Sequence, residues 1–187
     1  VFKIFFNFII KKELIENDFT LGDDFFHGPL TVTGSIAHFS SWDETKNLRV
    51  ITEYDLEAEK ILNQWYQDDD NYTVNVWGWG ITEIYLDSRG ILWIGYQNNN
   101  SISVKLKDSD IFINRTTDVS IFKGDNLELA NFLKMFILNS AGYMPQTFYE
   151  DSNGIMWFGS DNGLLFKVDI NNYTFDNVKI ICGVRRL

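Results

Sequence analysis

The sequence predicts an all-β fold built from repeated hairpins, with one short helical insertion. The main observation is a twelve-residue pattern that occurs twice, as IYLDSRGILWIG over residues 84–95 and as FYEDSNGIMWFG over residues 148–159. Each copy reads as a strand, a tight turn and a second strand that ends in Trp-x-Gly. The second observation is composition, because 45% of the 187 residues are hydrophobic and 16% are aromatic. A chain of this composition can bury a hydrophobic core, and the repeated hairpins are expected to pack around that core.

Four positions recur together within the pattern, and each residue type has a structural reason. The Asp opens a turn in which its carboxylate accepts backbone N–H bonds, and the first Gly closes that turn. The uncharged run around the Trp suits a strand buried on both faces, and the second Gly marks a close approach of another backbone or of the neighbouring Trp. These structural repeat positions are Asp87, Gly90, Trp93 and Gly95 in the first copy, and Asp151, Gly154, Trp157 and Gly159 in the second.

The spacing of the copies predicts a β-propeller. A weaker third copy is expected upstream at Asp43, which follows a strand-like segment. The interval from Asp43 to Asp87 matches the length of about 40–45 residues that a four-stranded propeller blade occupies. The interval from Asp87 to Asp151 is longer, and helix formers over residues 127–138, with residues 125–126 as N-cap and Gly142 after the end, account for the excess. We therefore predict a partial β-propeller of about three to four blades of four-stranded antiparallel sheet.

These assignments divide the chain into consecutive segments. Because a closed propeller needs at least about four blades, we expect the chain to be a fragment of a longer protein. The apolar residues 1–10 are too few for a membrane span and lack the leading charge of a signal peptide, so they are interpreted as a strand, with a degraded signal segment as the alternative. The first segment is a truncated N-terminal strand region at 1–30, and the second contains the propeller blades at 31–187. The blade segment comprises a degenerate blade at about 31–75, clear blades at about 76–120 and 142–187, and a helical insertion at about 121–141.

Charge and motifs exclude several classes of function. The net charge of −10 disfavours nucleic acid as a partner, because phosphate binding depends on clustered Lys and Arg. Cys182 is alone, so an intrachain disulfide cannot form, and it is expected to be a core residue. His27 and His38 share no metal motif, and residues 68–70 lack the spacing of a calcium loop. No nucleophile elbow or phosphate-binding loop is present, so we predict no cofactor, no metal and no catalytic residue.

The Asp-x-x-Gly-x-x-Trp-x-Gly pattern resembles the two-component regulator propeller repeat. The matching residues include ITEI at 81–84 before the first copy and DNGLL at 161–165 after the second. In that family the repeats form seven-bladed propellers in the periplasmic sensor half of bacterial hybrid histidine kinases that detect polysaccharide breakdown products. The first copy departs from the family after Gly95, where YQNNN at 96–100 replaces the usual Thr-x-x-Gly-Leu.

The resemblance implies a location and a set of partners. It places the chain on the periplasmic, extracytoplasmic face of a bacterial inner membrane. The expected partners are an oligosaccharide ligand, the remaining blades and downstream signalling domains of the parent chain, and a second copy of the parent in a homodimer.

A candidate ligand site lies just before each innermost strand, where the chain crosses from one blade to the next at the mouth of the central channel. Trp79 and Tyr143 are separated by the same interval as the aspartates of the two copies, so an aromatic residue occupies the equivalent rim position twice. Aromatic faces beside amide or hydroxyl groups suit a sugar ring. The alternative role for rim aromatics is packing between blades, which is also expected of the Trp of the repeat. The candidate ligand-binding residues are Trp77, Trp79, Tyr143 and Gln146.

Three classes of function follow. The leading hypothesis is a fragment of an extracytoplasmic sensor that binds an oligosaccharide and signals through a kinase elsewhere in its parent. The alternative is a propeller scaffold for protein–protein interaction without a small ligand. A weaker alternative is a polysaccharide-degrading propeller enzyme, for which the sequence nominates no catalytic residue.

Overall fold

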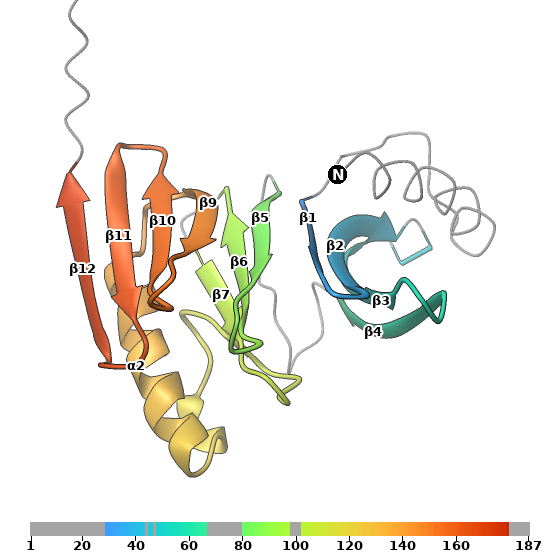
Figure 1. Cartoon of the computed structure of the whole chain (residues 1–187), viewed down its shortest axis with the longest axis horizontal. Coiled ribbons are helices and arrows are strands. Elements are labelled where there is room, and N and C mark those ends of the chain that lie inside the picture. Colours follow the sequence, from blue (N-terminus) through green and yellow to red (C-terminus); the bar gives the residue numbers. More distant parts are fainter. Residues whose placement is uncertain (1–28, 44, 47, 67–79, 98–101, 180–187) are drawn as a thin grey trace, which may run out of the picture.

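Three four-stranded antiparallel sheets make up most of the computed structural model, which describes residues 29–43, 45–46, 48–66, 80–97 and 102–179 (Figure 1). Within each sheet the strands are neighbours in chain order, which confirms the predicted partial propeller. Blade 1 contains β1 (Leu30–Thr33), β2 (Ile36–Asp43), β3 (Leu48–Asp55) and β4 (Lys60–Tyr66). Blade 2 contains β5 (Ile81–Leu86), β6 (Leu92–Tyr96), β7 (Ile102–Lys105) and β8 (Phe112–Ile113). Blade 3 contains β9 (Pro145–Glu150), β10 (Met156–Ser160), β11 (Leu164–Asp169) and β12 (Thr174–Lys179).

The first strands of the three sheets are their innermost strands. β5 contacts both β1 and β9, so each sheet meets the next mainly through its first strand (Figure 1). Side chains alternate between the two faces of a strand. Blade 2 therefore buries one face against blade 1 and the other against blade 3.

The predicted third copy of the repeat at Asp43 is wrong. Asp43 pairs with Leu48 across β2 and β3, so its turn joins the second and third strands of blade 1. The aspartates of the two clear copies instead lie between the first and second strands of their blades. The equivalent turn of blade 1 is the two-residue Gly34-Ser35 loop, in which Gly34 has a φ of +61°.

The blade period inferred from the interval between Asp43 and Asp87 is wrong as well. The first strands of the three blades begin at Leu30, Ile81 and Pro145, so the two intervals are unequal and both are longer than that period. Both predictions failed because every blade contains more than one hairpin, and an acidic residue can open the turn of any of these hairpins.

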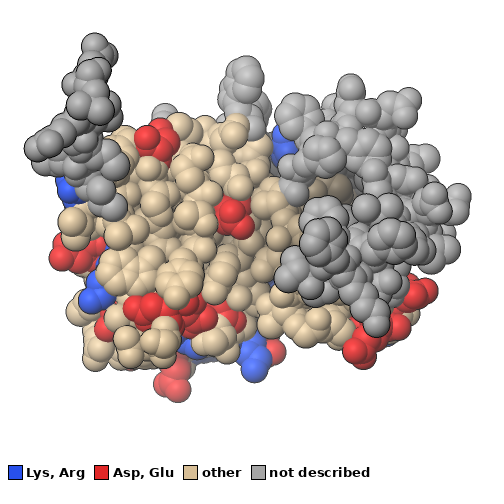
Figure 2. Space-filling view, turned by 45° about the horizontal axis from the view of Figure 1, so that its top comes forward, with Lys and Arg blue, Asp and Glu red and all other residues tan. Residues whose placement is uncertain are grey.

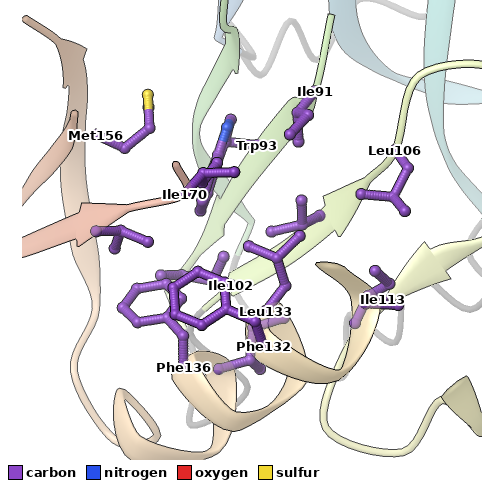
Figure 3. Packing of buried hydrophobic residues seen from close by; sticks show 14 of the residues in the cluster. Ile91, Trp93, Ile102, Leu106, Ile113, Phe132, Leu133, Phe136, Met156 and Ile170 are labelled. Carbon is purple, nitrogen blue, oxygen red and sulfur yellow. The ribbon is translucent and has the colours of Figure 1, made fainter. Parts of the chain in front are cut away.

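A helix fills the wedge between blades 2 and 3. After the 3₁₀ turn η1 (Val119–Ile121), α2 (Asp125–Asn139) has Gly124 as its N-cap, so Asp125 and Asn126, which were predicted as the N-cap, are the first two residues of the helix. Phe136 of α2 contacts the Trp93 ring of blade 2 and the Phe158 ring of blade 3, with centroids 6.3 and 5.7 Å apart. The buried face of α2 points toward Ile102 and Ile113 of blade 2 (Figure 3). The helix is thus part of the core.

Blades 1 and 2 meet through a smaller cluster of buried side chains. Ile51 and Trp65 of blade 1 pack with Ile84 and Phe112 of blade 2, and the Trp65 and Phe112 rings meet edge to face at 5.7 Å. Among the residues that the structure describes, this contact contains no helix.

Two sets of predicted features lie outside the described residues. They are residues 1–28 of the N-terminal region, with His27, and residues 68–70, Trp77, Trp79 and Cys182.

Candidate functional site

The predicted ligand rim is described only around blade 3. The Tyr143 side chain is half-buried, and its ring packs against Phe166 with centroids 5.2 Å apart. Gln146, the second residue of β9, is exposed. Trp77 and Trp79 lie outside the described residues, so the structure does not place them beside the other two. Tyr143 therefore combines a packing contact with a partly accessible ring.

Backbone contacts hold the rim of blade 3 in place. The Met144 N–H donates to the Asp161 carboxylate at 3.3 Å, and the Asp161 N–H donates to the Met144 carbonyl at 3.1 Å. Because Asp161 lies in the turn between β10 and β11, this turn and the entry to β9 form one edge of the blade. In Figure 2, where the upper side of Figure 1 is tipped forward, charged side chains are sparse over the centre of the view and gather toward its lower edge.

The repeated Asp-Ser-x-Gly turn has the same internal geometry in both copies. Asp87 accepts backbone N–H bonds from Arg89 and Ile91 at 3.0 and 2.9 Å, and its second oxygen accepts the Trp93 indole N–H at 3.1 Å. Gly90 closes the turn at a φ of +80° and donates to the Asp87 carbonyl at 2.9 Å. The motif is thus a closed unit in which the carboxylate fixes both the turn and the tryptophan.

The second copy repeats these bonds one by one. Asp151 accepts from the backbone of Asn153 and Ile155 at 2.8 and 3.1 Å and from the Trp157 indole at 3.0 Å. The hydrogen bond from Trp157, followed by those from the two backbone amides, lowers the pKa of the Asp151 carboxyl. This hydrogen bond was not predicted from the sequence, although the constant spacing between the Asp and the Trp was a signal for it.

Contacts between the two turns join blade 2 to blade 3. Ser88 donates its backbone N–H to one Glu150 carboxylate oxygen at 2.7 Å and its hydroxyl to the other at 2.6 Å. The Arg89 guanidinium donates to the Gly154 carbonyl at 2.7 Å and also bonds Asp87 at 3.0 Å. We call this set the turn clamp. It was not predicted, because the partners that it joins across the blades are far apart in the chain.

Gly95 and Gly159 occupy equivalent positions with different surroundings. A Cβ atom at Gly95 would lie 2.7 Å from the Thr82 hydroxyl and 2.8 Å from the Pro145 ring, so these two side chains make the close approach there, and not the predicted backbone or tryptophan. Thr82 also donates its hydroxyl to the Pro145 carbonyl at 2.6 Å. A Cβ atom at Gly159 would meet no atom within 4 Å, so the close approach predicted there is wrong. In blade 3, Gln146 holds the position that Thr82 holds in blade 2.

Blade 3 presents an open apolar face on the side away from blade 2. The prediction that the Trp strand is buried on both faces holds for β6, which is buried throughout, but is wrong for β10, which is buried on one face. Tyr149 is 62% exposed, and Trp157 is half-buried. We call this surface the open face. It surrounds a shallow hollow of about 390 Å³ lined by Thr147, Tyr149, Trp157, Phe158, Gly159 and Leu165.

Polar side chains are buried where blades 1 and 2 meet. Within the described ranges, four buried atoms have no hydrogen-bond partner by distance and angle: His38 Nδ1, Ser40 Oγ and Tyr96 Oη at this contact, and Arg89 Nε in the turn clamp. His38 Nε2 lies 3.9 Å from a Glu53 carboxylate oxygen. Burial lowers the pKa of His38, Glu53 opposes this shift, and the Lys105 cation adds to it. Among the residues that the structure places, no group of three or more His, Cys, Asp or Glu lies together as a metal site.

Over the same residues, every helix is too short or too polar to cross a membrane.

Comparisons with known proteins agree with this geometry. The family model of the two component regulator propeller matches residues 139–162, which run from the end of α2 through the rim and the second copy of the motif. Curated protein sequences include no match to the chain.

Solved structures show a similar fold. Two structures of virginiamycin B lyase from Staphylococcus aureus, one of them a catalytically inactive variant with quinupristin, match at 16% identity and a TM-score of 0.50. They cover 82% and 84% of this chain, which spans only 41% and 43% of the lyase chains. The extracellular domain of a hybrid two-component system from B. thetaiotaomicron matches at 10% identity and a TM-score of 0.47, over 81% of this chain and 16% of that one.

At these identities the likeness to the lyases concerns the fold alone. The family match is more specific, because it falls on the residues whose bonds define the repeat: Asp151 accepts the Trp157 indole N–H, and Gly154 closes the turn between them. The chain thus carries a two-component regulator propeller repeat on blade 3, and the resemblance inferred from its sequence is confirmed.

Proposed function

We propose that the chain is part of the extracytoplasmic sensor propeller of a two-component signalling protein and that its rim binds an oligosaccharide. The observation that carries the proposal is the position of the family match. Residues 139–162 include the rim residues Tyr143 and Gln146 as well as the repeat itself. The remaining blades and the downstream signalling domains of the parent chain are the proposed partners, with homodimers of the parent transmitting the signal.

The chemistry of the rim supports a sugar ligand. The Tyr143 ring is supported from behind by Phe166, and the reciprocal Met144–Asp161 bonds fix the connection that carries it. A rigid aromatic surface loses little entropy when a sugar ring stacks on it. The exposed Gln146 amide offers both a donor and an acceptor to sugar hydroxyls. Trp79, at the equivalent position before β5, is proposed to add a second aromatic surface.

The proposal assigns binding and no catalysis to this chain. The signalling chemistry belongs to a kinase elsewhere in the parent, on the far side of the membrane.

Isothermal titration of the chain against a panel of oligosaccharides from bacterial and plant polysaccharides tests the proposal. One oligosaccharide is expected to bind, and Tyr143→Ala and Trp79→Ala should each weaken its affinity at least about tenfold, as expected when one stacking contact is lost. Tyr143→Phe should retain most of the affinity, because the ring remains. Tyr149→Ala is the matched control, since Tyr149 is an exposed aromatic residue of the same blade on the open face.

The alternatives give different results in the same experiment. If no oligosaccharide of a broad panel binds although circular dichroism shows that the protein is folded, the sensor hypothesis is rejected in favour of a scaffold for protein–protein interaction. The apolar open face is the observation that supports this second candidate function. If new reducing ends accumulate during incubation, the chain is a polysaccharide-degrading enzyme.

A further inference from the structure

The carboxylate of Glu83 on β5 has no cation beside it among the residues that the structure describes. The side chain is half-buried. Burial raises the pKa of the Glu83 carboxyl, the backbone N–H of Ile84 opposes this shift, and no charged group in the described ranges contributes to it. Glu83 therefore differs from Glu150, whose carboxylate is bound by Ser88 and lies 3.5 Å from the Arg89 guanidinium.

Strand pairing places Glu83 next to the entry of β9. Glu83 pairs with Gly95 across β5 and β6, and the Pro145 ring packs against Gly95. The residue before Glu83 is Thr82, which donates its hydroxyl to the Pro145 carbonyl at 2.6 Å. Because Pro145 directly precedes Gln146, Glu83 belongs to the same edge of the molecule as the candidate ligand rim.

The second copy of the motif indicates the face on which the Glu83 side chain lies. Thr147 pairs with Gly159 as Glu83 pairs with Gly95. Thr147 lines the hollow of the open face, on the side of blade 3 away from blade 2. The equivalent side of blade 2 is turned toward blade 3, where Tyr85 of the same strand packs against the shared core. The Glu83 side chain thus lies on the side of blade 2 that meets blade 3.

The other described charges at this edge leave it negative. Asp161 brings a second carboxylate to the rim, where it accepts the Met144 N–H. The Arg49 guanidinium of blade 1 lies 3.7 Å from the position that a Cβ atom of Gly80 would take, but it forms no ion pair with Glu83. In Figure 2 the middle of this side shows acidic and uncharged side chains, whereas basic side chains lie toward its margins.

An aromatic face near a carboxylate suits an ammonium group. The electron-rich face of a ring attracts a cation, and a carboxylate forms a charge-assisted hydrogen bond with it. A sugar hydroxyl can also donate to Glu83, but it lacks the positive charge that offsets the burial of a carboxylate. A carboxylate or sulfate group on the ligand would be repelled by both Glu83 and Asp161.

We propose that the ligand of the rim is an oligosaccharide containing an amino sugar with a free amine, and that Glu83 selects it by pairing with the ammonium group while the sugar ring stacks on Tyr143. The inference rests on the proposed function, because it names the chemical class of the ligand bound at the same rim. The ammonium group supplies the cation that Glu83 lacks within the described part of the chain.

Isothermal titration of the chain with matched tetrasaccharides tests the inference. Three of them, built from glucosamine, N-acetylglucosamine and glucose, share one linkage and differ only at the second carbon of each ring, and a tetrasaccharide of galacturonic acid is the anionic control. The glucosamine tetrasaccharide is expected to bind at least about tenfold more tightly than the other three, as expected for one hydrogen bond between charged groups. This preference should weaken as the salt concentration rises.

The decisive variant is Glu83→Gln. It should bring the affinities for the glucosamine and glucose tetrasaccharides to about the same value, because the amide keeps the hydrogen bonds but loses the charge. Its Tm should be no lower than that of the original chain, since the change removes a half-buried charge. Asp176→Asn is the matched control, because it removes one negative charge from an exposed position on the last strand of blade 3 and should leave the preference intact.

The results separate this inference from the proposed function. If a glucose, N-acetylglucosamine or galacturonic acid tetrasaccharide binds as tightly as the glucosamine one, and Tyr143→Ala weakens that binding, the inference is overturned and the proposed function stands. An unchanged preference in Glu83→Gln overturns the inference as well. Binding confined to oligosaccharides of the broad panel that lack an amine also overturns the inference alone, whereas the absence of binding by every oligosaccharide overturns both.

Discussion

Trp93 and Trp157 occupy the same position of the same motif, yet one is inaccessible to solvent and the other is half-buried. Their local surroundings are alike, because each indole N–H donates to the aspartate of its own turn, at 3.1 Å in the first copy and 3.0 Å in the second. What differs is the neighbouring layer. Blade 3 and α2 cover the first tryptophan, and no described residue covers the second in the same way.

The difference separates two roles that the motif combines. The Asp turn and its tryptophan form a unit that needs only its own hairpin, since its bonds are present in both copies. Burial of the tryptophan comes from the adjacent blade, and the need for glycine at the end of the strand comes from Thr82 of the same blade together with Pro145 of the adjacent blade. In a stack of repeats, the stability of one repeat therefore includes a term supplied by its neighbour.

The largest expected effect is a contrast between the two tryptophans. Trp93→Ala should lower the free energy of unfolding by about 3–5 kcal/mol, because it leaves a cavity between two blades and α2. Trp157→Ala should cost only about 1–2 kcal/mol, because water reaches the vacated space and the main loss is a hydrogen bond and partial burial. Urea unfolding of the two variants measures the difference. Equal losses would show that the open face is covered in solution.

A smaller contrast is expected at the turn clamp. Ser88→Ala removes the hydroxyl that donates to Glu150 and should cost about 1 kcal/mol. Ser152→Ala, at the equivalent position of blade 3, should change stability by less than about 0.5 kcal/mol, as surface substitutions usually do. Chemical denaturation of both variants checks this. If Ser152→Ala costs as much as Ser88→Ala, the serine acts within its own turn and not between blades.

The smallest expected effect concerns the contact between blades 1 and 2, which has buried ionisable groups in place of a turn clamp. Burial lowers the pKa of His38 in the folded state below its ordinary value of 6.5. The unfolded chain therefore binds more protons near that pH, and stability should fall as the pH decreases through about 6.5. Thermal unfolding at pH 7.5 and 5.5 should show this fall, and His38→Gln should reduce it. An unchanged slope in the variant would show that the pKa of His38 in the folded state equals its value in the unfolded chain.

Only part of the candidate site could be predicted from the sequence. Tyr143 was found because it repeats the position of Trp79, but its packing on Phe166 links two segments that the sequence pattern does not relate. The turn clamp was missed for a different reason. Its key residues, Arg89 and Glu150, lie at positions where the two copies differ, so a search for recurring residues does not select them.

The sequence by itself determined the hairpins, the Asp turns with their glycines, the all-β class and the helical insertion. These depend on residues a few positions apart, whose conformational preferences and hydrogen bonds are local. Only the tertiary structure decided which hairpin of blade 1 corresponds to the repeat, that α2 is a wedge in the core, and which tryptophan is covered. Those outcomes depend on contacts between layers that are distant in the chain, as Ser88 is from Glu150. The residues of the repeated motif are the same in both blades, so they do not indicate whether an adjacent blade covers the tryptophan.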